Sequence, residues 1–158
     1  MFKHYTVTDN IFNKIIFYNK KVNSTNVELE AELQELSSKY GFSPKIIDTV
    51  YEDDKAIINM EFINEPCLFY KYGKYPEDIP EFVWDQMRIK LLKLYQEEGV
   101  QYFDITPYNF IEKDGNVYVI DFGHANYIYE DEEPDEFFID FLQGENDWNY
   151  DFYDIPDN

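Results

Sequence analysis

Three polar residues in the second half of the chain have the types and the spacing that phosphoryl transfer requires. Asp104 is followed by Asn109 five positions later and by Asp121 twelve positions after that. A nucleoside triphosphate carries Mg²⁺, and a protein that binds both needs hard oxygen ligands on separate backbone segments. Asn109 and Asp121 can supply those oxygens, and Asp104 can accept the proton of an attacking hydroxyl. The pattern predicts a Mg²⁺ site beside a catalytic base.

A β-hairpin is expected to hold two of these residues together. The runs Asn109–Glu112 and Val117–Asp121 are strand-like, and Asp114-Gly115 between them is a strong two-residue turn signal. Such a hairpin would place Asn109 and Asp121 side by side at its open end.

The stretch 102–123 resembles the catalytic and metal-binding loops of the protein-kinase-like superfamily. That pattern is H-R-D, an Asn five residues after the Asp, and then D-F-G. Asp104 matches the catalytic Asp, Asn109 the metal-binding Asn, and Asp121 the first residue of D-F-G. The three matches occur together at the right spacing, so the resemblance implies kinase-like chemistry.

The same stretch departs from ordinary protein kinases. Tyr102 and Phe103 stand where the pattern has His and Arg, and Thr106 stands where it usually has Lys. The first glycine of the chain is Gly41, so no glycine-rich loop can precede the first helix, and we expect weaker nucleotide affinity or a more open site. Without the Arg at position 103, switching by activation-loop phosphorylation is not expected. In its D-x-T-x-x-N sequence, the loop resembles that of compact atypical kinases and small-molecule kinases more than that of ordinary protein kinases.

The first part of the chain has the element order of a kinase small lobe. Strand-like runs are expected at Tyr5–Thr8, Ile11–Tyr18, Lys45–Tyr51 and Lys55–Ile63. Thr25 and Glu28 are spaced as a capping box that begins a helix between the second and third runs, and Gly41 ends it.

The second part begins with a long helix and ends in an acidic tail. The helix is predicted from about Pro80 to Glu98, and a shorter one over Pro134–Gln143. Aromatic residues near the end of the chain should pack back onto the domain: Trp148, Tyr150, Phe152 and Tyr153. With the resemblance, this order implies an α+β fold, a minimal two-lobed protein-kinase-like fold. Residues 1–63 would form the small lobe up to the hinge, and residues 64–158 a reduced large lobe.

The resemblance also implies how adenine would be held. Met60 would be the gatekeeper residue at the end of the last small-lobe strand. The carbonyl of Glu61 and the amide of Ile63 would meet the edge of the base.

An ion pair between a small-lobe Lys and a helix Glu would hold the α- and β-phosphates. We take Glu30 as the acid, with Glu28 and Glu32 as alternatives. Lys20 is taken as the lysine of this ion pair because it shares a strand face with Ile16 and Tyr18. Lys21 and Lys14 are the alternatives.

The predicted function is ATP- and Mg²⁺-dependent transfer of the γ-phosphate to a hydroxyl acceptor. Asp104 would be the catalytic base, and Thr106 would donate a hydrogen bond to the transferred phosphate. One alternative is a pseudokinase or interaction module that binds a protein partner through its acidic surface. Another is an acidic binding protein unrelated to kinases.

The charge distribution restricts the partners. The net charge is −20, of which −3 lies in residues 1–63 (ten acids, seven Lys) and −17 in the remainder (twenty-three acids, six basic residues). Nucleic-acid binding depends on cations that neutralise phosphates, so it is not expected; a basic protein partner or substrate is more plausible. The single cysteine excludes an internal disulfide, and no apolar run is long enough to span a membrane. We therefore expect a soluble, cytoplasmic protein.

Overall fold

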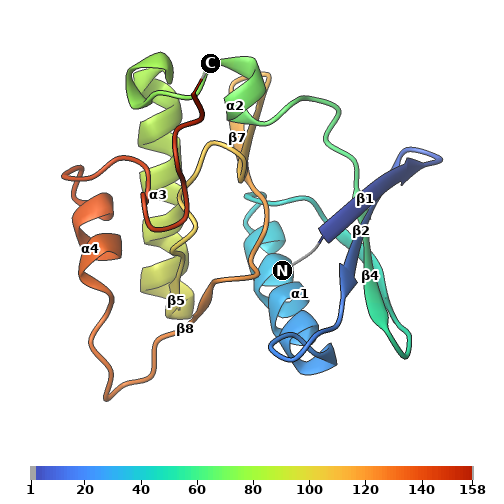
Figure 1. Ribbon diagram of the computed structural model, residues 1–158. Helices are drawn as coiled ribbons and strands as arrows, with labels where there is room; N and C mark the ends of the chain where they lie inside the picture. The colour runs from blue at the N-terminus through green and yellow to red at the C-terminus, as the bar shows by residue number, and fades with distance from the viewer. Residues whose placement is uncertain (1–2, 158) are drawn as a thin grey trace.

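A four-stranded antiparallel sheet and one helix form the small lobe. The computed structural model describes residues 3–157. The strands are β1 (Lys3–Thr8), β2 (Ile11–Phe17), β3 (Ile46–Tyr51) and β4 (Lys55–Glu61), arranged in the order β1-β2-β4-β3. Helix α1 (Ser24–Lys39) lies between the sheet and the large lobe (Figure 1).

Strand alternation gives the two central strands a common inner face. The cross-strand pairs are Phe12 with Met60, Lys14 with Ile58 and Ile16 with Ala56. Ile16, Ala56 and Ile58 are fully buried, and Val27 and Ala31 of α1 belong to the same core. Lys14 stands among these apolar side chains and is 8% exposed.

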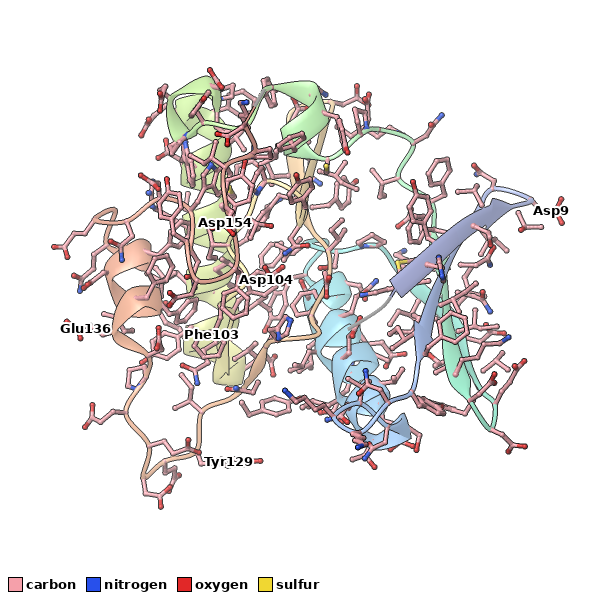
Figure 2. The ribbon with its side chains drawn as sticks, viewed as in Figure 1. Asp9, Phe103, Asp104, Tyr129, Glu136 and Asp154 are labelled. Atoms are coloured by element: carbon pink, nitrogen blue, oxygen red, sulfur yellow. The ribbon has the colours of Figure 1, made fainter. Side chains whose placement is uncertain are left out.

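The turn between β1 and β2 lies at the end of the sheet where β4 ends. Asp9 and Asn10 have φ angles of 53° and 64°, which suit a tight two-residue hairpin turn. Ile11 pairs with Glu61, the last residue of β4. Figure 2 shows Asp9 at the outer tip of the hairpin, on the side of the molecule away from Asp104. Lys14 pairs with Ile58, three residues before Glu61 on β4, so this turn does not lie over Lys14.

The start of α1 differs from the sequence prediction. Asn23 is the N-cap, and its side chain accepts hydrogen bonds from the backbone N–H groups of Thr25 (3.0 Å) and Asn26 (3.2 Å). The Asn26 side chain in turn accepts from the N–H of Asn23 at 2.8 Å. The predicted box of Thr25 and Glu28 was wrong because an Asn pair two residues earlier satisfies the same backbone donors.

The large lobe is built around helix α3 (Glu81–Glu98), which begins after Pro80 and ends at Gly99, as predicted. Gly99 has a φ of 66°, the left-handed conformation typical of a helix end. The buried side of α3 consists of Val83, Trp84, Met87, Lys90, Leu91 and Leu94. The helix contacts α4 (Glu136–Leu142) and the hairpin strand β7 (Asn116–Val119).

The remaining elements of this lobe are short. They are α2 (Leu68–Lys71), the 3₁₀ turn η1 (Pro76–Asp78), β5 (Val100–Gln101) paired with β8 (Asn126–Tyr127), and β6 (Phe110–Lys113) paired with β7. The tail packs back onto the lobe as predicted: Trp148 is 1% and Tyr153 3% exposed, whereas Tyr150 and Phe152 lie at the surface. The α+β, two-lobed kinase-like fold is confirmed (Figure 1). The lobe boundary at residue 63 stays a prediction.

Candidate active site

An ion pair connects the sheet with α1. The ammonium group of Lys14 contacts the carboxylate of Glu30, and the two side chains are only 10% and 4% exposed. The same Nζ lies 3.4 Å from Oδ1 of Asp121. A small-lobe lysine, a helix acid and the first residue of D-F-G thus form one charged network between the lobes.

The prediction that Lys20 pairs with Glu30 was wrong. β2 ends at Phe17, so the strand alternation on which that choice depended does not reach Lys20, which is exposed in a bend. Lys14, named as an alternative, is the residue that contacts Glu30. Of the other acids considered, Glu28 is exposed and Glu32 accepts a hydrogen bond from the hydroxyl of Tyr127.

The predicted hairpin is confirmed. β6 and β7 pair from Phe110–Val119 to Lys113–Asn116, and the turn residues Asp114 and Gly115 have φ angles of 53° and 83°. At the open end, the N–H of Ile120 donates to the carbonyl of Asn109 at 2.9 Å. This bond places the segments that carry Asn109 and Asp121 side by side.

The side chains of Asn109 and Asp121 are oriented by local hydrogen bonds. Nδ2 of Asn109 donates to the carbonyl of Asp104 at 2.9 Å, which leaves Oδ1 as the acceptor atom of the amide. Oδ1 of Asp121 accepts from the N–H of Gly123 at 3.0 Å. Asp121 has a φ of 64°, a left-handed conformation that Asp and Asn adopt more readily than most residues.

Tyr102, which replaces the His of the pattern, links the two loops. Its hydroxyl donates to the carbonyl of Ile120 at 2.7 Å, and its ring contacts those of Phe110 and Phe122. The side chain is 1% exposed, and this burial raises the pKa of Tyr102 well above its usual value, so the hydroxyl stays a donor. The sequence identified the replacement but not this role.

The catalytic loop turns tightly between Asp104 and Asn109. The N–H of Thr106 donates to the carbonyl of Asp104 at 3.0 Å, and the N–H of Asn109 donates to the carbonyl of Thr106 at 3.2 Å. Asp104 is half-buried, whereas Thr106 is 3% exposed. Contact between the Thr106 hydroxyl and a transferred phosphate stays a prediction, and the burial of Thr106 does not favour it.

A cavity of about 530 Å³ lies between the lobes, within the size range of small-molecule sites. Lys14, Asn109 and Asp121 line one part of it. The predicted hinge residues also line it: Met60, Glu61 and Ile63. Met60 and Ile63 are buried, at 5% and 7% exposure. The structure thus brings the two candidate Mg²⁺ ligands and the three hinge residues to one cavity. The other predicted site residues are not among its lining residues: Asp104, Thr106, Glu30 and Lys20.

Aromatic side chains that the sequence did not single out line the same cavity. The rings of Tyr5 and Phe12 are nearly parallel (14°) with centroids 5.0 Å apart, and those of Phe12 and Phe62 are 15° and 6.5 Å apart. Tyr5 pairs with Lys14 across the two strands and is 68% exposed. The alternation of Tyr5 and Val7 along β1 was the only local signal for this face.

Cys67 lies at the start of α2 and also lines the cavity. It is half-buried, and burial raises the pKa of its thiol.

Comparison with protein families identifies the chain. The profile of the RIO domain matches residues 2–140. The chain belongs to the RIO domain family. RIO domains are atypical members of the protein-kinase-like superfamily, a phosphotransferase family that generally uses ATP and Mg²⁺, which makes a nucleotide the expected partner. Comparison with curated proteins gave no match.

The match includes every predicted site residue of this RIO domain, whereas the tail after residue 140 lies outside it. Within residues 3–157, none of the helices combines the length and apolar character needed to span a membrane.

Proposed function

We propose that this RIO domain is an ATP- and Mg²⁺-dependent phosphotransferase that transfers the γ-phosphate to a hydroxyl acceptor. The observation that carries the proposal is the buried ion pair of Lys14 with Glu30. The same Lys14 ammonium lies near Asp121, and both Lys14 and Asp121 line a cavity of nucleotide size. An ammonium group held by a buried acid is suited to bind phosphate oxygens without losing its direction. Glu30 would act through Lys14, because it lies behind the lysine in the core.

Asn109 and Asp121 fit a Mg²⁺ ion that arrives with the nucleotide. They offer an amide oxygen and a carboxylate from adjacent segments, and both line the cavity. Mg²⁺ characteristically takes few protein ligands and completes its shell with phosphate oxygens and water. When bound, the ion would offset the negative charge that develops on the transferred phosphate.

Asp104 would act on the acceptor. In the proposed step, the acceptor hydroxyl gives its proton to an Asp104 carboxylate oxygen, and the hydroxyl oxygen bonds to the γ-phosphorus. The bond from that phosphorus to the β,γ-bridging oxygen breaks, and ADP leaves. Asp104 is half-buried in the loop that also carries Asn109. One segment therefore holds both the group that would take the proton and a candidate Mg²⁺ ligand.

The base of the nucleotide would lie at the other end of the cavity. We infer that the carbonyl of Glu61 and the amide of Ile63 meet the adenine edge, with Met60 behind them and Phe12 above. The apolar lining contributed by Met60, Phe12 and Phe62 favours a flat aromatic ligand there. The hinge would then follow β4, which supports a lobe boundary near residue 63.

The test is ATP binding by calorimetry with Mg²⁺ and with chelator, followed by a Mg²⁺-dependent ATPase and self-phosphorylation assay. Asp121→Asn keeps a residue that tolerates the left-handed backbone, so its loss of Mg²⁺-dependent binding would report the ligand and not the fold. Asp104→Asn should keep binding and lower turnover by roughly 10²- to 10⁴-fold. Turnover that survives Asp104→Asn would contradict the proposal.

One observation favours the alternative of a protein-binding module with vestigial chemistry. The β1–β2 turn lies beside Glu61 and not beside Lys14, so it supplies no backbone N–H groups to the phosphates. Such a module would bind a basic partner through the acidic tail. Partner binding that survives Asp121→Asn and is lost on deletion of residues 130–158 would favour this alternative.

A further inference from the structure

Asn149, in the tail beyond the family match, binds the main-chain carbonyls of the two residues on either side of Asp104. Its backbone N–H donates to the carbonyl of Ile105 at 2.8 Å. Its side-chain Nδ2 donates to the carbonyl of Phe103, also at 2.8 Å. We propose that Asn149 is a positioning residue for Asp104, an inference that rests on the proposed function.

The side-chain amide of Asn149 is suited to this role because both its nitrogen and its oxygen form hydrogen bonds. Oδ1 accepts from the N–H of Asp151 at 3.1 Å, and the main-chain carbonyl accepts from the N–H of Phe152 at 2.9 Å. These bonds to the tail direct Nδ2 toward the loop. The residue is 5% exposed, so water does not replace the bonds easily. A carboxylate at position 149 could not donate to the Phe103 carbonyl and would instead face it.

The loop at Asp104 depends on such bonds because it belongs to no helix or strand. From the nucleotide side, Nδ2 of Asn109 holds the carbonyl of Asp104 itself. Asn149 holds the carbonyls before and after it. Together the two asparagines fix three consecutive carbonyl groups, and hence the direction in which the Asp104 side chain leaves the backbone. A general base must lie within hydrogen-bond reach of its proton, and a displacement of about 1 Å can cost on the order of 10²-fold in rate.

The tail is anchored independently of Asn149. The indole of Trp148 packs on that of Trp84 with centroids 4.5 Å apart. The hydroxyl of Tyr153 donates to the carbonyl of Lys74 at 2.9 Å, and Nζ of Lys74 donates to the carbonyl of Pro156 at 2.7 Å. Replacing the Asn149 side chain should therefore release the carbonyl of Phe103, while the backbone bond to Ile105 and the tail stay in place.

The experiment compares Asn149→Ala and Asn149→Asp with Tyr153→Phe in the full chain. Tyr153→Phe is the matched control, because it removes one tail hydrogen bond that does not reach the catalytic loop. We expect both Asn149 variants to lower kcat by roughly 10- to 100-fold. The KM for ATP and the ATP affinity by calorimetry should stay within about twofold of wild type, since a kcat loss without a KM change marks an interaction needed after substrate binding. Tyr153→Phe should leave kcat within about twofold of wild type.

Hydrogen exchange of the amides at residues 103–106 gives a readout that needs no turnover. Exchange should be faster in Asn149→Ala than in Tyr153→Phe or wild type. Unchanged kcat, equal kcat losses in Asn149→Ala and Tyr153→Phe, or unchanged exchange would each overturn the inference. If wild type binds Mg²⁺-ATP but transfers no phosphate, the proposed function fails. The exchange result then still decides whether Asn149 orders the loop.

Discussion

Removing one partner of the buried Lys14–Glu30 ion pair should destabilise the protein, because the remaining charge would stay buried without a counter-charge. In Lys14→Met, Glu30 would remain 4% exposed without its cation, and we expect a loss of about 3 kcal/mol in the free energy of unfolding. In the double variant Lys14→Met/Glu30→Leu most of this loss should be recovered, because two apolar side chains fit the surrounding core. Urea unfolding measures the stability, and calorimetry with Mg²⁺-ATP should show no binding to either variant. A double variant as unstable as the single one would contradict this account.

Tyr5 is expected to affect nucleotide affinity without affecting the fold. It is 68% exposed, opposite Lys14, and its ring extends the aromatic lining formed by Phe12. An aromatic contact of this kind corresponds to roughly tenfold in affinity, so Tyr5→Ala should weaken ATP binding by about that factor and Tyr5→Phe much less.

The matched control for this experiment is Tyr51→Ala. Tyr51 is also an exposed tyrosine, on the opposite edge strand of the same sheet, and it does not line the cavity. Calorimetry with ATP compares the three variants. Equal affinity in Tyr5→Ala and Tyr51→Ala would show that the Tyr5 ring does not meet the ligand.

Local motifs located part of the site, and tertiary contacts decided the rest. Asp104, Asn109 and Asp121 could be found because their spacing lies within one loop and one hairpin. Lys14 could not be chosen over Lys20 without knowing that β2 ends at Phe17. Asn149 left no signal, because its partner Phe103 is 46 positions away in the sequence.

Helix α1 positions Glu30, and its first turn provides a test of how the helix begins. Asn23→Ala removes the acceptor of two backbone N–H groups and should cost about 1 kcal/mol of stability. Thr25→Ala, at the position first expected to be the cap, should change stability by less than about 0.5 kcal/mol. Thermal unfolding distinguishes the two variants, and a larger loss in Thr25→Ala would favour the box that the sequence suggested.

Elements with strong local signals were predicted well. The hairpin of β6 and β7 follows from Asp114-Gly115, and α3 follows from its apolar spacing, Pro80 and Gly99. The sheet order β1-β2-β4-β3 could not be predicted in this way, because it depends on long-range pairing of β2 with β4, which no local pattern encodes. That pairing decides that the Asp9-Asn10 turn lies beside the hinge end of β4.

The pH dependence of stability belongs to the molecule as a whole. Burial lowers the pKa of Lys90 to about 8, and the usual value in an unfolded chain is about 10.4. Between these pH values the unfolded chain holds a proton that the folded protein lacks, so the free energy of unfolding should rise with pH. Lys90→Met should abolish this rise, although it also removes hydrogen bonds to Asn116 and the carbonyl of Val117.

At higher pH, the ionisation of tyrosines lowers the free energy of unfolding. Burial is the main cause that raises the pKa of Tyr72 and Tyr153 to about 12. Above about pH 10 the unfolded chain loses these protons first, so stability should fall as pH rises further. Urea unfolding from pH 7 to 11 should therefore show a maximum near pH 10. A steady decline from pH 8 in wild type would contradict the assignment to Lys90.

Cys67 makes the cavity accessible to chemical footprinting. It is the single cysteine of the chain, so a thiol reagent can modify one position, and that position lies on the cavity wall. Because burial raises the pKa of the thiol, little thiolate is present at neutral pH and labelling should be slow. A ligand that fills the cavity would slow it further. The labelling rate of the unmodified protein can thus serve as a gauge of cavity occupancy for any compound tested.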